Sequence, residues 1–421
     1  MAHTILTNTV ITREAARILH QVDNFMGSVN LSYNDQFARS GAKAGTSINM
    51  RLPAKYTVRT GADFTGQDHV ERSTPLAVVS QYGVDVSFST FDRTLSLDDF
   101  SKRVLQPAMK QLAAKISYDS MNVAYKYVNN YTNGTTDTKL TYRYFQKNGQ
   151  NLTDQLAPYS DRTALLSPAS SVEFMDATKG LFHTAANINK HFREGIMGNT
   201  GGFDVGENTL LPSHTTGSLA GSPLTNGTAL GNTVTTNSWS SQTVLSIDGA
   251  TSTTTLKAGD IITLSGVYAV HPESKQNTGK LQTFVVQSDV TLTTAATAYD
   301  VTVKPAMISS ATNAFQNVAL SGVANTDGLT VTRIGAASTA FAQDLFFHKD
   351  AFALAVVDLE DVSAYGADCT RVRVDDISLR WIQQYNVSND KVYGRFDIAW
   401  GFAPLLPELA SRHLTTQSLL A

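Results

Sequence analysis

The sequence is poor in cysteine, in charge and in long apolar runs, and each shortage excludes a class of protein. A single cysteine, Cys369, among 421 residues cannot form an internal disulfide or a cysteine-based zinc site. We expect it to pack as a small apolar residue. No run approaches the roughly 18 apolar residues of a membrane-spanning helix. The N-terminus lacks a basic segment followed by an apolar one, so we expect no secretory signal.

The charge content is low and balanced. Charged residues make up 16% of the chain, against about 25% in a typical globular domain. The net charge is -3 and the pI about 6.3, so no basic block favours tight nucleic-acid binding. A protein with so few charges often covers part of its surface with other copies of itself, although β proteins rich in threonine, asparagine and serine share this composition.

Two stretches in the first third of the chain have helical periodicity in their apolar residues. Residues 12–25 carry apolar side chains at helical spacing, and Thr12 can cap that helix. The clearest pattern covers Asp98–Tyr131 and predicts a helix roughly 50 Å long, in which Pro107 introduces a kink or marks the end of a first turn. We expect its apolar face to pack on a β-sheet. That face consists of Leu105, Ala108, Leu112, Ile116, Val123 and Tyr127.

A long hairpin precedes the long helix. Two strand-like segments, Thr46–Arg59 and Pro75–Ser89, flank the polar stretch Thr60–Thr74. The polar tip has too few apolar residues to form its own core, so it must be solvated or lie on a neighbour. We take its charged residues as candidate assembly contacts: Arg59, Asp63, Asp68, Glu71 and Arg72.

Further elements are predicted downstream. Ser167-Pro168 is a cap followed by proline at the first helical position, and Asn187–Met197 favours a second helix. Asp344–Leu359 indicates a buried strand, or a strand with a short helix. The chain closes in a hairpin, with alternating apolar residues in Arg371–Tyr385 and Lys391–Phe402.

The composition changes between Ser213 and Ser338. Threonine rises there to roughly one residue in five, far above ordinary usage. Ser213–Ile247 contains no Asp, Glu, Lys or Arg. Short β-prone runs alternate with turn residues, and both flanks have different chemistry. The pattern predicts an inserted all-β domain, either a sandwich or a small barrel.

No catalytic or cofactor motif is present. Gly279-Lys280 is followed by leucine where a P-loop needs serine or threonine. The closest histidines on one helical region, His183 and His191, are eight residues apart, and ordinary histidines are favoured over a metal pair. Lys257-x-Gly259-Asp260 is interpreted as a turn before a strand. We expect no enzyme, no metal site and no cofactor.

The order of these parts resembles the major capsid proteins of tailed bacteriophages, most closely the short-tailed-phage coat family with an insertion domain. Thr46–Ser89 corresponds to the family's extended loop, and Asp98–Tyr131 to its spine helix. Within the insertion, Thr255–Val267 (TLKAGDIITLSGV) resembles the family's strand-turn-strand. The insertion is entered through Gly202-Phe203-Asp204 and then Leu211-Pro212, as in those coats.

The resemblance implies an α+β, Hong Kong 97-like fold with an N-terminal arm, extended loop, spine helix, peripheral and axial domains, and an inserted β-barrel. It implies hexamers and pentamers that close an icosahedral shell around double-stranded DNA, in a virion assembled in the bacterial cytoplasm. A scaffolding protein and a portal are the implied partners, and no membrane is involved. The expected divisions are residues 1–45 (arm), 46–97 (extended loop and peripheral strands), 98–212 (spine helix and peripheral/axial domain), 213–338 (inserted barrel) and 339–421 (closing part).

One departure and two alternatives accompany this interpretation. The family's insertion carries a charged loop that bridges neighbouring capsomers, whereas Ser213–Ile247 is uncharged, so any bridge would need hydrogen bonds or apolar contacts. The threonine, asparagine and glycine content also suits a tail-fibre or adhesin-like binding protein, but the long helix argues against it. A hydrolase would need a polar cluster that the sequence does not offer.

Overall fold

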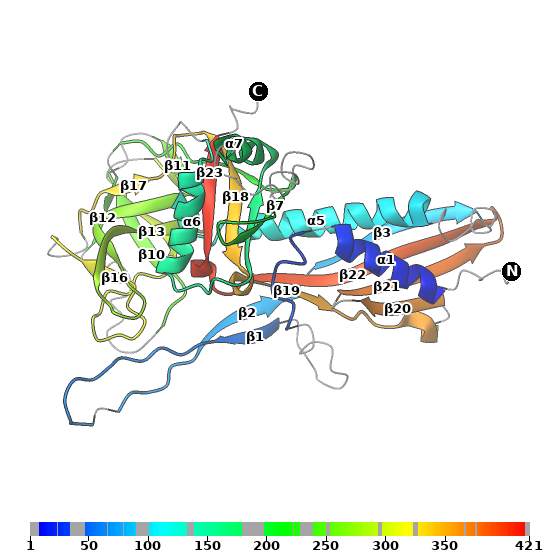
Figure 1. The fold of residues 1–421 in the computed structure, drawn as a ribbon, viewed down its shortest axis with the longest axis horizontal. Helices are drawn as coiled ribbons and strands as arrows, with labels where there is room; N and C mark the ends of the chain where they lie inside the picture. Colours follow the sequence, from blue (N-terminus) through cyan, green and yellow to red (C-terminus); the bar gives the residue numbers. More distant parts are fainter. Residues whose placement is uncertain are drawn as a thin grey trace. The chain divides into compact units, whose positions relative to one another are not determined.

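The fold is that of a computed structural model, which describes residues 8–22, 24–33, 47–64, 66–78, 80–89, 101–132, 139–178, 198–221, 223–227, 239–249, 253–293, 297–322, 327–365, 368–374 and 377–416 (Figure 1). The chain divides into two compact units. The first comprises residues 1–50, 74–120 and 352–405, and the second comprises residues 51–73, 121–351 and 406–421.

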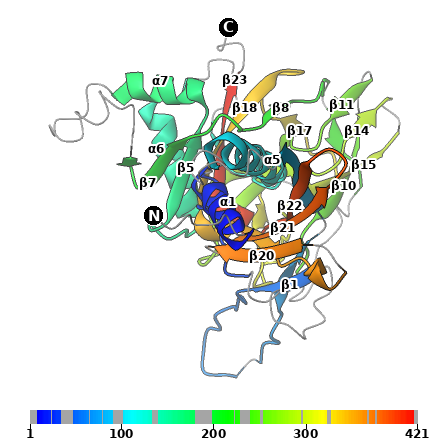
Figure 2. The same cartoon turned by 90° about the vertical axis from the view of Figure 1, so that its right-hand side faces the viewer.

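The first unit is built on an antiparallel sheet of five strands. Helix α1 (Asn8–Val22) packs on β20 and β21 (Figure 2). The apolar positions 11, 15, 18 and 19 of α1 are buried, which explains its amphipathic pattern. The strands run in the order β19 (Phe352–Val357), β22 (Lys391–Pro404), β21 (Ile377–Asn386) and β20 (Asp368–Val374), and β3 (Ser80–Ser89) also pairs with β22.

The predicted closing hairpin is confirmed by the pairing of β21 with β22, but its first strand is shorter than the predicted Arg371–Tyr385. Residues 371–374 belong to β20, which pairs antiparallel with β21. The pairing begins at Asn386 opposite Lys391 and brings Trp381 opposite Phe396. Both of these aromatic side chains are fully buried, as the alternation predicted. A Cβ atom on Gly394 would lie 1.9 Å from Trp381 Cη2, so only glycine lets the indole ring cross this strand.

The long helix is shorter than expected. A π-helical segment, η1 (Ser101–Leu105), leads directly into α5 (Gln106–Ala124), and Pro107 lies in its first turn. The helix ends at Ala124 and not at Tyr131, and residues 98–100 lie outside the described residues. The predicted face is correct as far as Ile116 but wrong at Val123, which is 39% exposed. The buried line in the last turns runs instead through Ser117, Ser120, Met121 and Ala124.

Other boundaries also differ from the expectations. Helix α1 begins at Asn8, so Thr12 is a buried residue inside the helix and not its cap. Cys369, on β20, is only partly buried. The predicted helix over Asn187–Met197 lies outside the described residues. No described helix is long and apolar enough to cross a membrane.

A second sheet, of seven strands, is the core of the second unit. Helices α6 (Tyr142–Asp154) and α7 (Pro168–Thr178) accompany it, and Ser170 N donates to Ser167 Oγ, which confirms the predicted helix start. The Phe145 ring lies 4.5 Å from Phe174 and 5.3 Å from Phe346, so aromatic stacking joins both helices to the sheet. The strands are β4 (Tyr131–Thr132), β23 (Ala410–Thr416), β18 (Ala340–His348), β5 (Arg162–Leu166), β7 (Phe203–Glu207), β6 (Gly198–Thr200) and, paired with β18, β8 (Ser213–Thr215).

The expected strand with a short helix over Asp344–Leu359 is confirmed. Strand β18 ends at His348, the 3-10 turn η2 (Lys349–Ala351) follows, and β19 begins at Phe352. Two further 3-10 turns occur, η3 (Val362–Tyr365) and η4 (Pro407–Leu409).

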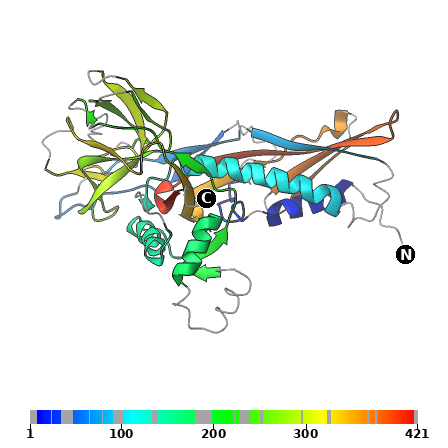
Figure 3. The ribbon, with the colours of Figure 1, turned by 90° about the horizontal axis from the view of Figure 1, so that it is seen from above.

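The inserted β module is a closed barrel, whose green-to-yellow strands lie together in Figure 3. Neighbouring strands pair through β12, β13, β15, β10 and β9, and a bridge between Leu224 and Thr330 leads from β9 to β17, which pairs with β12. The ring therefore closes and leaves few open edges. Its strands are β9 (Leu224–Thr225), β10 (Thr243–Asp248), β12 (Ile261–Val270), β13 (Asn277–Val286), β15 (Tyr299–Lys304), β16 (Val318–Leu320) and β17 (Val331–Arg333), with β11 (Thr254–Leu256) and β14 (Val290–Leu292) as a separate pair.

The barrel encloses its own apolar core. Ile262 and Leu264 on β12 face the same interior as Phe284 on β13 and Val301 on β15, and none of these side chains is exposed. Alternation along each strand explains this arrangement, because every second side chain points inward. The expected α+β fold with an inserted all-β barrel is therefore confirmed.

Candidate assembly surfaces

The extended loop is a short hairpin with a long polar extension. Its strands are β1 (Ser47–Leu52) and β2 (Arg72–Ala77), which form a two-stranded sheet. The predicted strands were too long: the regular pairing stops at Leu52, and the alternation up to Ser89 belongs to β3, in the sheet of the first unit. Residues 53–71, except for position 65, are described without helix or strand.

Side-chain hydrogen bonds hold the two sides of the loop together where strand pairing has ended. Thr57 N donates to Gln67 Oε1 at 2.9 Å, and Gln67 Nε2 donates back to Thr57 O at 2.6 Å. Tyr56 Oη lies 2.7 Å from His69 Nδ1. Gln67 thus acts as a substitute for one rung of a β-ladder, so the loop has a defined shape before any partner binds.

The loop exposes apolar side chains as well as charges. Val58 is 98% exposed and Phe64 is 88% exposed. The Phe64 ring lies beside Gly66, where a Cβ atom would be 3.6 Å from the ring. The sequence interpretation considered only the charges of this tip and missed Val58 and Phe64. Isolated aromatic residues in a polar stretch carry no periodic signal, so burial alone could reveal them.

Four of the five predicted contact residues are solvent-exposed on the loop: Arg59, Asp63, Asp68 and Glu71. Arg59 Nη1 donates to Asp63 O at 2.9 Å and also to Gly61 O, which shapes the tip. Glu71 lies 3.5 Å from Arg51, and both side chains are exposed.

Arg72 is placed differently from the expectation. Its side chain is 7% exposed, and Nη2 donates to Pro53 O at 3.0 Å, across the base of the loop. Arg72 therefore stabilises the fold of the subunit, because the guanidinium satisfies a carbonyl that strand pairing leaves open.

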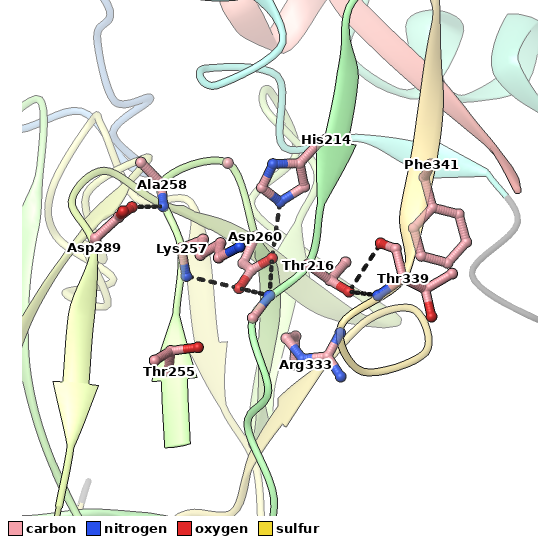
Figure 4. Close-up of polar contacts among 12 residues, drawn as sticks. His214, Thr216, Thr255, Lys257, Ala258, Asp260, Asp289, Arg333, Thr339 and Phe341 are labelled. Atoms are coloured by element: carbon pink, nitrogen blue, oxygen red, sulfur yellow. Dashed lines mark hydrogen bonds and ion pairs between the residues drawn. The ribbon is translucent and has the colours of Figure 1, made fainter. Parts of the chain in front are cut away.

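A buried polar cluster joins the barrel to the core sheet within the second unit (Figure 4). Asp260 accepts hydrogen bonds from His214 Nε2 at 2.9 Å, Gly217 N at 3.0 Å and Lys257 N at 2.9 Å. His214 lies on β8, where the chain enters the insertion, and Asp260 directly precedes β12 of the barrel. A fully buried carboxylate is tolerated here because several donors surround it.

The turn before β12 is confirmed and has a structural role. Asp260 N donates to Lys257 O at 2.9 Å, and Gly259 has φ of +106°. A Cβ atom on Gly259 would lie 2.7 Å from Tyr125 Cε2, so this position excludes any other residue without local rearrangement. The close approach lets the barrel contact the end of the spine helix.

Arg412 on β23 completes the joint. Its Nη2 atom donates to Gly259 O at 2.7 Å, its Nη1 atom donates to Gln343 Oε1 at 3.1 Å, and its guanidinium lies 5.8 Å from the centre of the Tyr125 ring. Burial lowers the pKa of Arg412 to about 10. The side chain is buried, and the hydrogen bonds and the Tyr125 ring hold it in position.

The described residues contain no group of three or more His, Cys, Asp or Glu side chains that could hold a metal ion. Buried Asp344 is surrounded by donors, Ser167 N at 2.8 Å and the hydroxyls of Ser170 and Thr415 at 2.5 and 3.2 Å. Burial raises its pKa. These hydrogen bonds join the start of α7 to the sheet strands β18 and β23.

The chain matches a family model described as P22 coat protein, gene protein 5, over residues 26–415. No curated protein matches the sequence. Among solved structures, one titled Mycobacterium phage Che8 shares 10% identity, with a TM-score of 0.44 and coverage of 92% of this chain and 89% of that chain.

Two further structures are similar. The capsid structure of the cyanophage P-SCSP1u shares 11% identity, with a TM-score of 0.41 and coverage of 88% of this chain and 84% of that chain. The CUS-3 coat protein I-domain shares 21% identity over 28% of this chain and 96% of that chain, with a TM-score of 0.17.

Proposed function

As a member of the P22 coat protein family, this chain is a major capsid protein that assembles with copies of itself into the icosahedral shell of a tailed bacteriophage, and we propose that its extended loop, residues 51–73, binds a neighbouring copy. The family match supports the expected Hong Kong 97-like fold and a structural role without catalysis. It also excludes the tail-fibre or adhesin alternative.

The loop proposal is supported by two observations together: the loop has a defined shape, and its apolar side chains are not buried in a core of the subunit. The loop is ordered by its own hydrogen bonds, yet it presents Val58 and Phe64 to solvent. Exposed apolar groups on a preformed surface favour binding, because little conformational entropy is lost when they become buried. In an assembling protein, the partner that repeats at every site is another copy.

The charged residues of the loop contribute to the same proposed contact. We assign Arg59, Asp63, Asp68 and Glu71 to the exposed rim, and Arg72 to the base that positions them. Exposed ion pairs are individually worth about 0–1 kcal/mol, so these groups favour orientation over affinity.

Replacement of residues 58–66 by a short glycine-containing turn tests the loop proposal. Because Arg72 and the Pro53 carbonyl are retained, the melting temperature of the isolated subunit should stay nearly unchanged. Sedimentation and electron microscopy should show that shells no longer form. Normal shells from the shortened chain would refute the proposal, and an unfolded subunit would show that the tip belongs to a core.

We further propose that the copies form hexamers and pentamers around double-stranded DNA, with a scaffolding protein and a portal as assembly partners. The proposal follows from the family resemblance. A net charge of -3 suits a container, because a weakly acidic protein holds DNA without binding it tightly. The divisions at residues 45, 97, 212 and 338 are likewise proposed as the borders of arm, loop, core and insertion.

A further inference from the structure

Two basic side chains from distant parts of the chain contact the same barrel segment at the base of the extended loop, and a third, Lys55, is close enough for its charge to act on both. Lys55 and Arg72 belong to the two sides of the loop, and Lys275 belongs to the turn between β12 and β13 of the barrel. All three lie in the second unit. Arg72 is buried, and the two lysines are partly buried.

One segment of the barrel, Ala314–Gln316, holds two of these cations. The Arg72 guanidinium lies 5.6 Å from the centre of the Phe315 ring. Lys275 Nζ donates to Ala314 O at 2.9 Å and to Gln316 O at 3.2 Å, the carbonyls of the residues before and after Phe315 in sequence. The apolar neighbours Val70 and Trp239 pack on the same ring cluster, so the loop base and the barrel hold the cations in place.

The charges at this point do not balance. Burial and then repulsion from Arg72 lower the pKa of Lys55, and burial with the charges of Lys55 and Arg72 lowers the pKa of Lys275 to about 8. Glu408 is the one carboxylate of the described chain that acts in the opposite direction on Lys55 and Arg72. Glu408 thus partly offsets the charges of Lys55 and Arg72, whereas no carboxylate of the described residues acts in this way on Lys275.

We propose that Lys55, Arg72 and Lys275 form a docking site for a carboxylate side chain from a second copy of this chain. The site lies at the base of the loop and is separate from the proposed contact of the tip. Partial burial has already removed part of the water from the cations, so a carboxylate placed there gains more than it would in an exposed ion pair.

Charge complementarity identifies the occupant. The chain assembles with copies of itself, and each copy carries exposed carboxylates, among them Asp63, Asp68 and Glu71 on the loop. An arriving carboxylate would relieve the mutual repulsion of the three cations, which among the described residues Glu408 offsets only for Lys55 and Arg72.

The test uses Lys55→Gln, which removes the charge of Lys55. Lys275→Gln is less suitable, because it would also remove the two hydrogen bonds of Lys275 to backbone carbonyls. We expect the thermal midpoint of the isolated subunit to stay the same or rise, since one of three like charges is removed. The critical concentration for shell assembly should rise by about three- to tenfold. Lys55→Arg, which keeps the charge, should restore both values.

Lys349→Gln is the matched control, because it removes an exposed lysine elsewhere in the same unit and should change neither value. An unchanged critical concentration for Lys55→Gln would overturn the proposal, as would a fall in the subunit's midpoint. The midpoint is also measured in sodium phosphate and in sodium chloride at equal ionic strength. If phosphate stabilises the wild-type subunit but not Lys55→Gln, while the critical concentration is unaffected, a small anion and not a second copy occupies the site.

Discussion

Phe64 is expected to contribute more to assembly than any charge of the loop. Its side chain is 88% exposed, and the loop is held by hydrogen bonds that do not involve it. Phe64→Ala should therefore change the free energy of unfolding of the isolated subunit by less than about 0.5 kcal/mol.

The expected effect on assembly follows from the area of the ring. Burying a phenylalanine side chain stabilises a contact by about 1.5–3 kcal/mol, and aromatic anchors at interfaces reach about 2–4 kcal/mol. A loss of about 2 kcal/mol per contact corresponds to a rise of roughly 30-fold in the dissociation constant of that contact. Each subunit of a closed shell repeats the contact, so the critical concentration should rise steeply.

Light scattering over a series of subunit concentrations measures that change, and thermal melting of unassembled subunits measures the stability. Val172→Ala is the control, because Val172 is an exposed apolar residue of α7. A Phe64→Ala protein that assembles at the wild-type concentration would refute the anchor role. A subunit destabilised by more than about 1 kcal/mol would show that the ring packs inside its own chain.

Three further substitutions test the buried face of α5 and a buried carboxylate. Leu112→Ala should lower the free energy of unfolding by about 2–5 kcal/mol, whereas Val123→Ala should change it by less than about 0.5 kcal/mol, because only Leu112 is buried; denaturant titration of both checks the corrected helix face. Since burial raises the pKa of Asp344, the neutral acid is favoured in the folded subunit, so the stability it contributes is present at low pH and is lost as pH rises through the raised pKa. The stability of the wild type relative to Asp344→Asn should therefore fall as the pH rises above about 4, the ordinary pKa of an aspartic acid, and a pH-independent difference would contradict this assignment.

The periodicity of apolar residues correctly predicted those elements in which one fixed face is buried along the whole length. Alternation placed Ile377, Leu379 and Trp381 on the buried face of β21, because each strand has one side on the core. The helical pattern failed at Val123, because the buried face of α5 rotates in its last turns to Ser117, Ser120, Met121 and Ala124. Sequence periodicity contains no information about such a rotation.

Helix α6 shows another limit of the pattern. Its sequence includes Asn148, Gly149 and Asn151, which disfavour helices, and no helix was predicted there. Tertiary contacts compensate: Asn148 Oδ1 accepts from Ser411 Oγ at 2.7 Å, and Asn151 Nδ2 donates to Tyr131 O at 3.1 Å. These polar residues are used because they bind the neighbouring strands, which only the folded chain brings together.

The candidate surfaces were predictable in position but not in composition. A polar stretch between two strands indicated an exposed loop, and its charged residues could be identified at once. The contribution of Phe64 depends on its exposure, and the grouping of Arg72 with Lys275 depends on the barrel segment Ala314–Gln316, which lies more than 200 residues from Arg72 in sequence. Neither fact is encoded in local spacing.

The position of the insertion explains how the core tolerates a whole barrel. Residues 213–215 of β8 pair with residues 340–342 of β18, so the chain leaves the core sheet and returns to it on adjacent antiparallel strands. An insertion whose ends lie this close adds a domain without separating the strands on either side. Strand β8 also contains His214, which forms a hydrogen bond with Asp260 of the barrel. Arg412, on the neighbouring strand β23, donates a hydrogen bond to Gly259 in the turn that precedes β12. The barrel is thus fixed to the sheet from which it emerges, and a shell subunit needs that fixed geometry if each copy is to meet its neighbours in the same way.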